Sequence, residues 1–130
     1  MKIYRIRDQM YDQNFRLIIG GTEQELCDYL NKKYKVEVEP LYASAKQLTV
    51  HLPNGDQKEY IWIEKFDWTV ADQGLLTHEL FHYAMTILNK LGINYTADSE
   101  EAFAYYLQYI FCQTWSKLKP RFKKEEKKEG

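Results

Sequence analysis

Three residues near the middle of the chain have the types and the spacing of a metal-dependent hydrolytic site. His78, Glu79 and His82 form the pattern H-E-x-x-H. Because residues four positions apart lie above one another on an α-helix, the two imidazoles could bind one ion. Zinc lowers the pKa of a bound water, and a carboxylate at the position of Glu79 could then act as general base. The spacing therefore predicts a Zn²⁺ site with Glu79 as a catalytic residue.

The same residues also have a structural interpretation. Partly buried histidines can be satisfied by tyrosine hydroxyls, and the chain contains 11 tyrosines. The third histidine, His51, stands alone in an expected strand, and we assign it no ligand role. Two histidines and one carboxylate also suit iron or manganese, so the identity of the metal stays open.

A catalytic zinc site usually has three protein ligands and one open position. Eighteen residues, 83–100, separate His82 from Glu101, which begins the string Glu-Ala-Phe-Ala. This arrangement resembles the gluzincin metallopeptidases, a branch of the zincins in which H-E-x-x-H precedes a liganding Glu on a second helix. Over about residues 70–110, the resemblance implies His78, His82 and Glu101 as zinc ligands and Glu79 as base. The short length is closer to stand-alone zincin-like proteins of phages and prophages.

The third ligand has two alternatives. Glu100 is adjacent to Glu101 and could replace it as the ligand. Asp98 and Glu101 also have the D-x-x-E spacing of a capping box, in which Glu101 would only stabilise the start of a helix. Tyr105 shares the helix face of Glu101, so its phenol could donate to a developing oxyanion; packing between helices is its other interpretation.

The remaining pattern predicts an α+β fold with a small antiparallel sheet, one N-terminal helix, and then two long helices that carry the zincin-type metal site. Thr22 and Glu25 form a capping box for the first helix, and Thr69 is the expected N-cap of the motif helix. The long helices are expected at 70–91 and 98–118. Strands are expected at 15–19, 35–39, 47–52 and 58–66, the last two joined by an Asn-Gly turn. We expect strand 58–66 to be the edge along which a substrate docks.

The 130 residues predict one domain, 1–118, and a charged, disordered tail, 119–130. The net charge of −1 gives no general reason to expect nucleic-acid binding. No apolar run approaches the roughly 20 residues of a membrane span, and the start lacks the apolar stretch of a signal peptide. We therefore expect a cytoplasmic protein without a membrane or nucleic-acid partner, in which Cys27 and Cys112 are both reduced.

Two functions fit these observations. The first is a zinc-dependent hydrolase, specifically a metallopeptidase acting on a peptide or protein substrate. The second is a non-catalytic interaction protein on a zincin fold, of a phage type that binds a host or virion protein. The intact Glu79 favours the first, since a structural metal site has no need of a base at that position.

Overall fold

The computed structural model describes residues 1–118, so the predicted tail, 119–130, lies outside the described residues. In the described part, the elements follow in the order β1 (Lys2–Asp8), β2 (Gln13–Ile19), α1 (Glu23–Tyr34), β3 (Ala45–His51), β4 (Gln57–Ile63), α2 (Val70–Lys90) and α3 (Glu100–Leu118). The predicted α+β class is confirmed. The predicted N-terminal helix is wrong, because α1 follows two strands.

The sheet is mixed rather than antiparallel, which corrects a second part of the prediction. Its strand order is β1-β2-β4-β3; β2 and β4 are parallel, and the two outer pairs are antiparallel. The physical reason is α1, which carries the chain across one face so that a later strand can run parallel to β2. The strand predicted at 58–66 as the edge of the sheet corresponds to β4, which is a central strand. The edge on that side of the sheet is formed by β3 instead.

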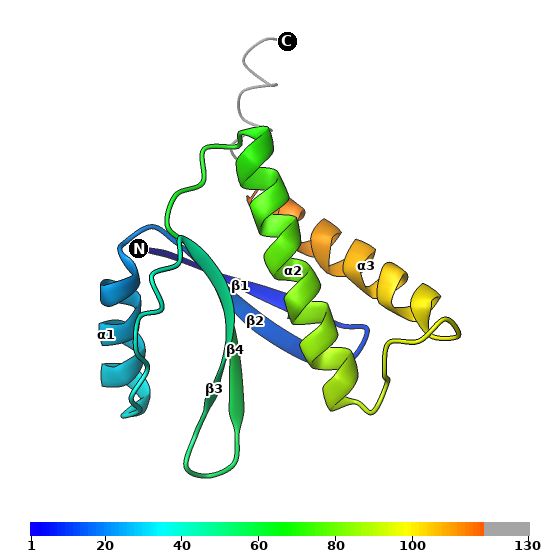
Figure 1. The fold of residues 1–130 in the computed structure, drawn as a ribbon, viewed down its shortest axis with the longest axis horizontal. Helices are drawn as coiled ribbons and strands as arrows, with labels where there is room; N and C mark the ends of the chain where they lie inside the picture. Colours follow the sequence, from blue (N-terminus) through cyan, green and yellow to red (C-terminus); the bar gives the residue numbers. More distant parts are fainter. Residues whose placement is uncertain (119–130) are drawn as a thin grey trace.

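The sheet lies between two helical layers. Figure 1 shows α1 on one face and α2 and α3 on the other. In β4, Ile61 and Ile63 pack in the cluster with α2 and α3, whereas Tyr60 and Trp62 pack in the cluster with α1. Because successive side chains of a strand point to opposite faces, β4 contributes to both cores. None of the helices in residues 1–118 has the length and apolar character needed to cross a membrane.

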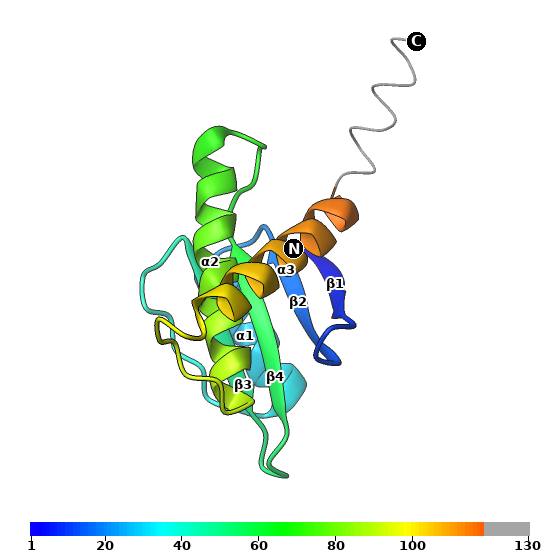
Figure 2. The same cartoon turned by 90° about the vertical axis from the view of Figure 1, so that its right-hand side faces the viewer.

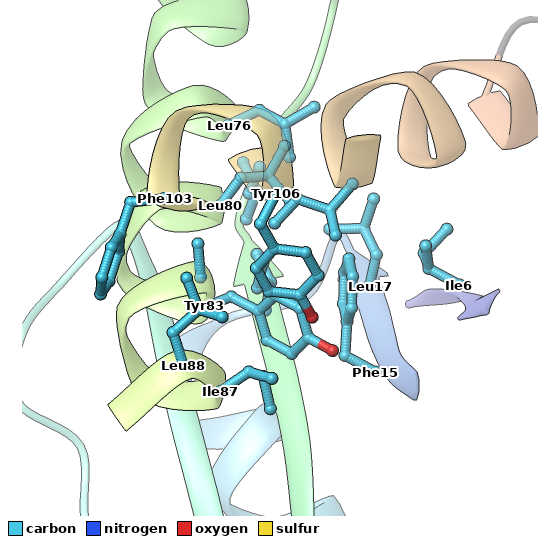
Figure 3. Close-up of a cluster of buried hydrophobic side chains, with 14 of the residues drawn as sticks. Ile6, Phe15, Leu17, Leu76, Leu80, Tyr83, Ile87, Leu88, Phe103 and Tyr106 are labelled. Atoms are coloured by element: carbon cyan, nitrogen blue, oxygen red, sulfur yellow. The ribbon is translucent and has the colours of Figure 1, made fainter. Parts of the chain in front are cut away.

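A buried polar contact joins α3 to the first hairpin. The hydroxyl of Tyr106 donates to Asp8, which also accepts hydrogen bonds from the backbone N–H groups of Met10 and Tyr11. In Figure 3 the hydroxyls of Tyr83 and Tyr106 point toward the same part of the core. α3 is thereby joined to the first hairpin in its N-terminal half, at the residue that directly follows Tyr105.

Candidate functional site

The motif lies at the border between the buried and exposed sides of α2. Thr69 caps the helix by accepting a hydrogen bond from the backbone N–H of Asp72, which confirms the predicted N-cap. The side of α2 that packs on the core carries Leu76, Leu80, Tyr83, Ala84 and Ile87. His78 and His82 are exposed, and Glu79 between them is buried. The helix thus presents two imidazoles to solvent beside one buried carboxylate.

The two imidazoles converge. The Nε2 atoms of His78 and His82 are 3.1 Å apart, and the ring centroids are separated by 4.7 Å with an interplanar angle of 76°. Oε1 of Glu79 lies 3.9 Å from Nε2 of His78. The side chain of His78 is 63% exposed and that of Glu79 only 7%. The prediction that the i, i+4 spacing brings both rings together is therefore correct in geometry.

Two chemical states fit this separation. In one, a neutral ring protonated at Nε2 donates a hydrogen bond to the Nε2 lone pair of the other ring. In the other, both rings carry their proton on Nδ1 and both Nε2 lone pairs are free to bind a cation. A metal would therefore replace the hydrogen bond between His78 and His82 without requiring the side chains to separate.

A groove of about 630 Å³ opens beside the motif, between residues 42–45 and the first half of α2. His78 and Glu79 line one end of it. Its far wall is held by the buried carboxylate of Glu23, which accepts hydrogen bonds from the backbone N–H groups of Leu41 and Ala43 and from Lys46. The groove wall is therefore anchored to the start of α1.

A second set of polar side chains, which sequence reasoning missed, joins α2 to the edge strand. The hydroxyl of Thr86 donates to the backbone carbonyl of His82 and lies 3.4 Å from Oε1 of Gln47 on β3. Glu59 on β4 accepts hydrogen bonds from Gln47 and from the hydroxyl of Thr49. Burial raises the pKa of Glu59. The sequence signal for this set is Glu59 itself, a carboxylate that alternates with Ile61 and Ile63 on the inward face of β4.

The other predicted site residues lie elsewhere. Glu101 is exposed in the first turn of α3. Because α3 begins at Glu100, Glu101 is the second helical residue rather than the third residue of a box starting at Asp98. Tyr105 lines a separate depression with Met10, Tyr109 and Cys112. In the part of the chain that the structure describes, no three His, Cys, Asp or Glu side chains are grouped to hold an ion, so Glu101 stays a prediction.

Comparison with known proteins gives no match: no family model, no curated protein and no solved structure corresponds to the chain. Within residues 1–118 there is also no three-ligand metal group. The identification of the chain with the gluzincins, or with small zincin-like proteins of phages, is therefore wrong. H-E-x-x-H fixes only three positions of a helix, and the string after Glu101 adds too little to establish common descent.

Proposed function

We propose that the protein is a zinc-dependent hydrolase in which His78 and His82 hold the ion and Glu79 is the general base. The observation that supports this most directly is the 3.1 Å between the two Nε2 atoms. Two nitrogens bound tetrahedrally to one zinc at about 2.0–2.1 Å lie about 3.3 Å apart. The donor set and its spacing therefore fit two of the four positions around one zinc ion.

Glu79 is suited to moving a proton. Its carboxylate is buried, and its Oε1 lies 3.9 Å from Nε2 of His78. When bound, zinc would supply acidification of a water and polarisation of a carbonyl. Glu79 would accept the proton of the attacking water and return it to the leaving amine, which is the work of a general base and then a general acid.

The third ligand belongs to the same proposal. Glu101 is our candidate, with Glu100 as the alternative, because both carboxylates open α3. The exposed position of Glu101 leaves its carboxylate available to an ion. Iron or manganese would suit the same donors, so the metal is to be identified by measurement.

The proposed substrate is a peptide or protein segment lying in the groove between α2 and residues 42–45. Both cysteines are free, Cys27 buried and Cys112 exposed, which supports a reducing, cytoplasmic setting.

A second candidate is a non-catalytic interaction protein that uses the same groove. Three large apolar side chains beside it are exposed: Leu41 by 76%, Tyr42 by 97% and Val70 by 88%. Exposed apolar side chains around a depression are typical of surfaces that bind another protein. This candidate needs no proton transfer by Glu79, so substitution of Glu79 separates the two functions.

The first experiment is elemental analysis of untagged protein, purified without added zinc and again after zinc is offered. We expect one zinc per chain in the wild type and its loss in a His78→Ala, His82→Ala double variant. Glu101→Ala and Glu100→Ala test the third ligand, and His51→Ala is the matched control that should keep the ion. A wild-type chain that takes up no metal would overturn the proposal.

The second experiment uses Glu79→Gln, which keeps the shape of the side chain and removes the base. A hydrolase should lose peptide cleavage by about 10²–10⁴-fold and keep its zinc. Unchanged cleavage would exclude Glu79 as the base. The second candidate would be established by two results together: the wild type cleaves no peptide, and Glu79→Gln binds the partner protein as the wild type does.

A further inference from the structure

The margin of the sheet opposite β3 carries a cluster of arginines. In β1, Ile6 and Asp8 are buried on the side of α3, so the alternating Arg5 and Arg7 project from the other face. Both arginines are exposed. Figure 2 shows β1 at the margin of the sheet, beside the C-terminal half of α3. The cluster therefore lies at the opposite margin of the sheet from β3, one of the strands that α2 contacts.

The nearest cross-strand neighbour adds to the positive charge. Arg5 is directly opposite Arg16 on β2. Like charges opposite one another in an antiparallel pair are destabilising. In residues 1–118, the ion pairs are Lys46 with Glu23, Lys65 with Asp67, and a contact of His78 with Glu79, so none involves these arginines. An anionic partner would relieve this repulsion.

A cleft of about 290 Å³ continues the positive surface from β1 to α3. Its lining consists of Arg5, Ile6 and Arg7 of β1 and Gln113, Ser116 and Lys117 of α3. No carboxylate is among its lining residues in the described part of the chain. Since the whole chain has a net charge of −1, this concentration of cations is local.

β1 also has an open backbone edge. It pairs with β2 along Lys2–Asp8 and has no strand on its other side within residues 1–118. A free strand edge presents unpaired N–H and C=O groups that can accept a further strand. The edge therefore selects for an extended polypeptide, because only a peptide backbone can complete the ladder.

We propose that an extended acidic peptide segment of a partner protein binds alongside β1 as an additional strand. Alternate residues of a strand are about 7 Å apart on one face, so carboxylates at alternate positions would match Arg5 and Arg7. Side chains of the other face would meet Gln113, Ser116 and Lys117. The partner is thus a segment with Asp or Glu at every second position.

A peptide fits better than single-stranded nucleic acid. Nucleic-acid strands bind through aromatic side chains that offer a free ring face to the bases. Here the nearby rings already pack against one another: Phe66 and Trp115 each contact Trp68 edge to face, and Trp115 is stacked on Phe111. The unpaired backbone of β1 would also be left unused by a nucleotide chain.

The test is fluorescence anisotropy of the full chain with a labelled peptide in which Glu and Thr alternate. We expect saturable binding that weakens about tenfold or more in Arg5→Glu, Arg7→Glu and falls with added salt. Lys117→Glu should also weaken binding, by a change on α3 that leaves β1 intact. Lys32→Glu, Lys33→Glu on α1 is the matched control with an expected change below about twofold.

Two further probes decide between the possible partners. The same peptide with N-methyl groups on alternate residues should lose binding, because it cannot complete the ladder. Equal binding of the N-methylated peptide, or no binding of the parent peptide, would overturn the proposal. So would a poly-deoxythymidine strand that binds more tightly and displaces the peptide. The His78→Ala, His82→Ala variant should bind the peptide as the wild type does, which separates this site from the proposed hydrolase.

Discussion

The hydroxyl of Tyr106 donates a hydrogen bond to Oδ2 of Asp8, a residue 98 positions earlier in the chain. Burial raises the pKa of Tyr106, so its hydroxyl stays protonated and remains a donor. Tyr106→Phe should lower the free energy of unfolding by about 1–3 kcal/mol, because the buried carboxylate of Asp8 then loses one of its donors. Urea unfolding measures the change.

Tyr95→Phe is the matched control for this prediction. Tyr95 is half exposed, and its hydroxyl makes no hydrogen bond within residues 1–118, so we expect a change within about 0.5 kcal/mol. Equal losses in the two variants would mean that the contact between Tyr106 and Asp8 does not stabilise α3 on the sheet.

The stability that the Glu23 carboxylate contributes at the groove wall should be lost in acid. Burial opposes ionisation of Glu23, but hydrogen bonds from Leu41, Lys46 and Ala43 prevail and lower its pKa to about 2. A lowered pKa gives stability that is present above the unfolded value of 4.5 and is lost as the pH falls toward 2. Glu23→Gln should therefore cost about 1–3 kcal/mol at neutral pH and progressively less in acid.

Urea unfolding of the wild type and Glu23→Gln across that acid range measures the effect. The exposed Glu37 provides the control, and Glu37→Gln should leave the free energy of unfolding unchanged within about 0.5 kcal/mol. If the Glu23→Gln loss is the same in acid as at neutral pH, the ionised carboxylate is not what holds Leu41 and Ala43 in place.

Glu59 should show the opposite dependence on pH. Burial raises its pKa above 4.5, while the hydroxyl of Thr49 and the charge of Lys90 offset part of the shift. A raised pKa gives stability that is complete below 4.5 and is lost as the pH rises through the folded value. The stability of the wild type relative to Glu59→Gln should therefore fall as the pH rises. Urea unfolding of both proteins measures this difference in the free energy of unfolding. If the wild type instead became more stable relative to Glu59→Gln as the pH rises, burial would not be opposing ionisation of Glu59.

Gly74 offers a test that links stability to the groove. It lies inside α2 with ordinary helical geometry, and an added Cβ would meet no atom of the described chain within 4 Å. Gly74→Ala should raise the free energy of unfolding by about 0.5–1 kcal/mol, because Ala loses less backbone entropy in a helix. Since Gly74 lines the groove, the same change should weaken substrate or partner binding.

Gly55 is the control, because it has equal space for a Cβ but a φ of +92°. Gly55→Ala should lower stability, since only glycine adopts that conformation without strain. A destabilised Gly74→Ala would show that the helix needs glycine there for a reason other than open space, and thermal unfolding of both variants distinguishes these results.

Local signals in the sequence predicted much of the fold. The capping box of Thr22 and Glu25 and the N-cap at Thr69 are present, and the Asn-Gly turn joins β3 to β4. These features depend on residues within a few positions of one another. The convergence of His78 and His82 belongs to the same class, because helical spacing alone brings the rings together.

Features that depend on distant contacts could not be predicted in this way. The expected strand at 35–39 is absent because the side chain of Asn31 bonds the backbone N–H and C=O of Val38, which satisfies them without a neighbouring strand. β1 was overlooked although Tyr4 to Asp8 alternates inward and outward residues. The position of Glu101 depends on the path of the loop between α2 and α3, which no local pattern specifies.

The central position of β4 has a consequence for synthesis on the ribosome. β1 and β2 form their hairpin early, but the parallel neighbour of β2 is made only after α1 and β3 have emerged. Until then β2 has β1 on one edge and no strand on the other, and such transiently open edges promote misassembly. Chains arrested before residue 57 should therefore depend on chaperones, and release of Gln57–Ile63 should reduce that dependence.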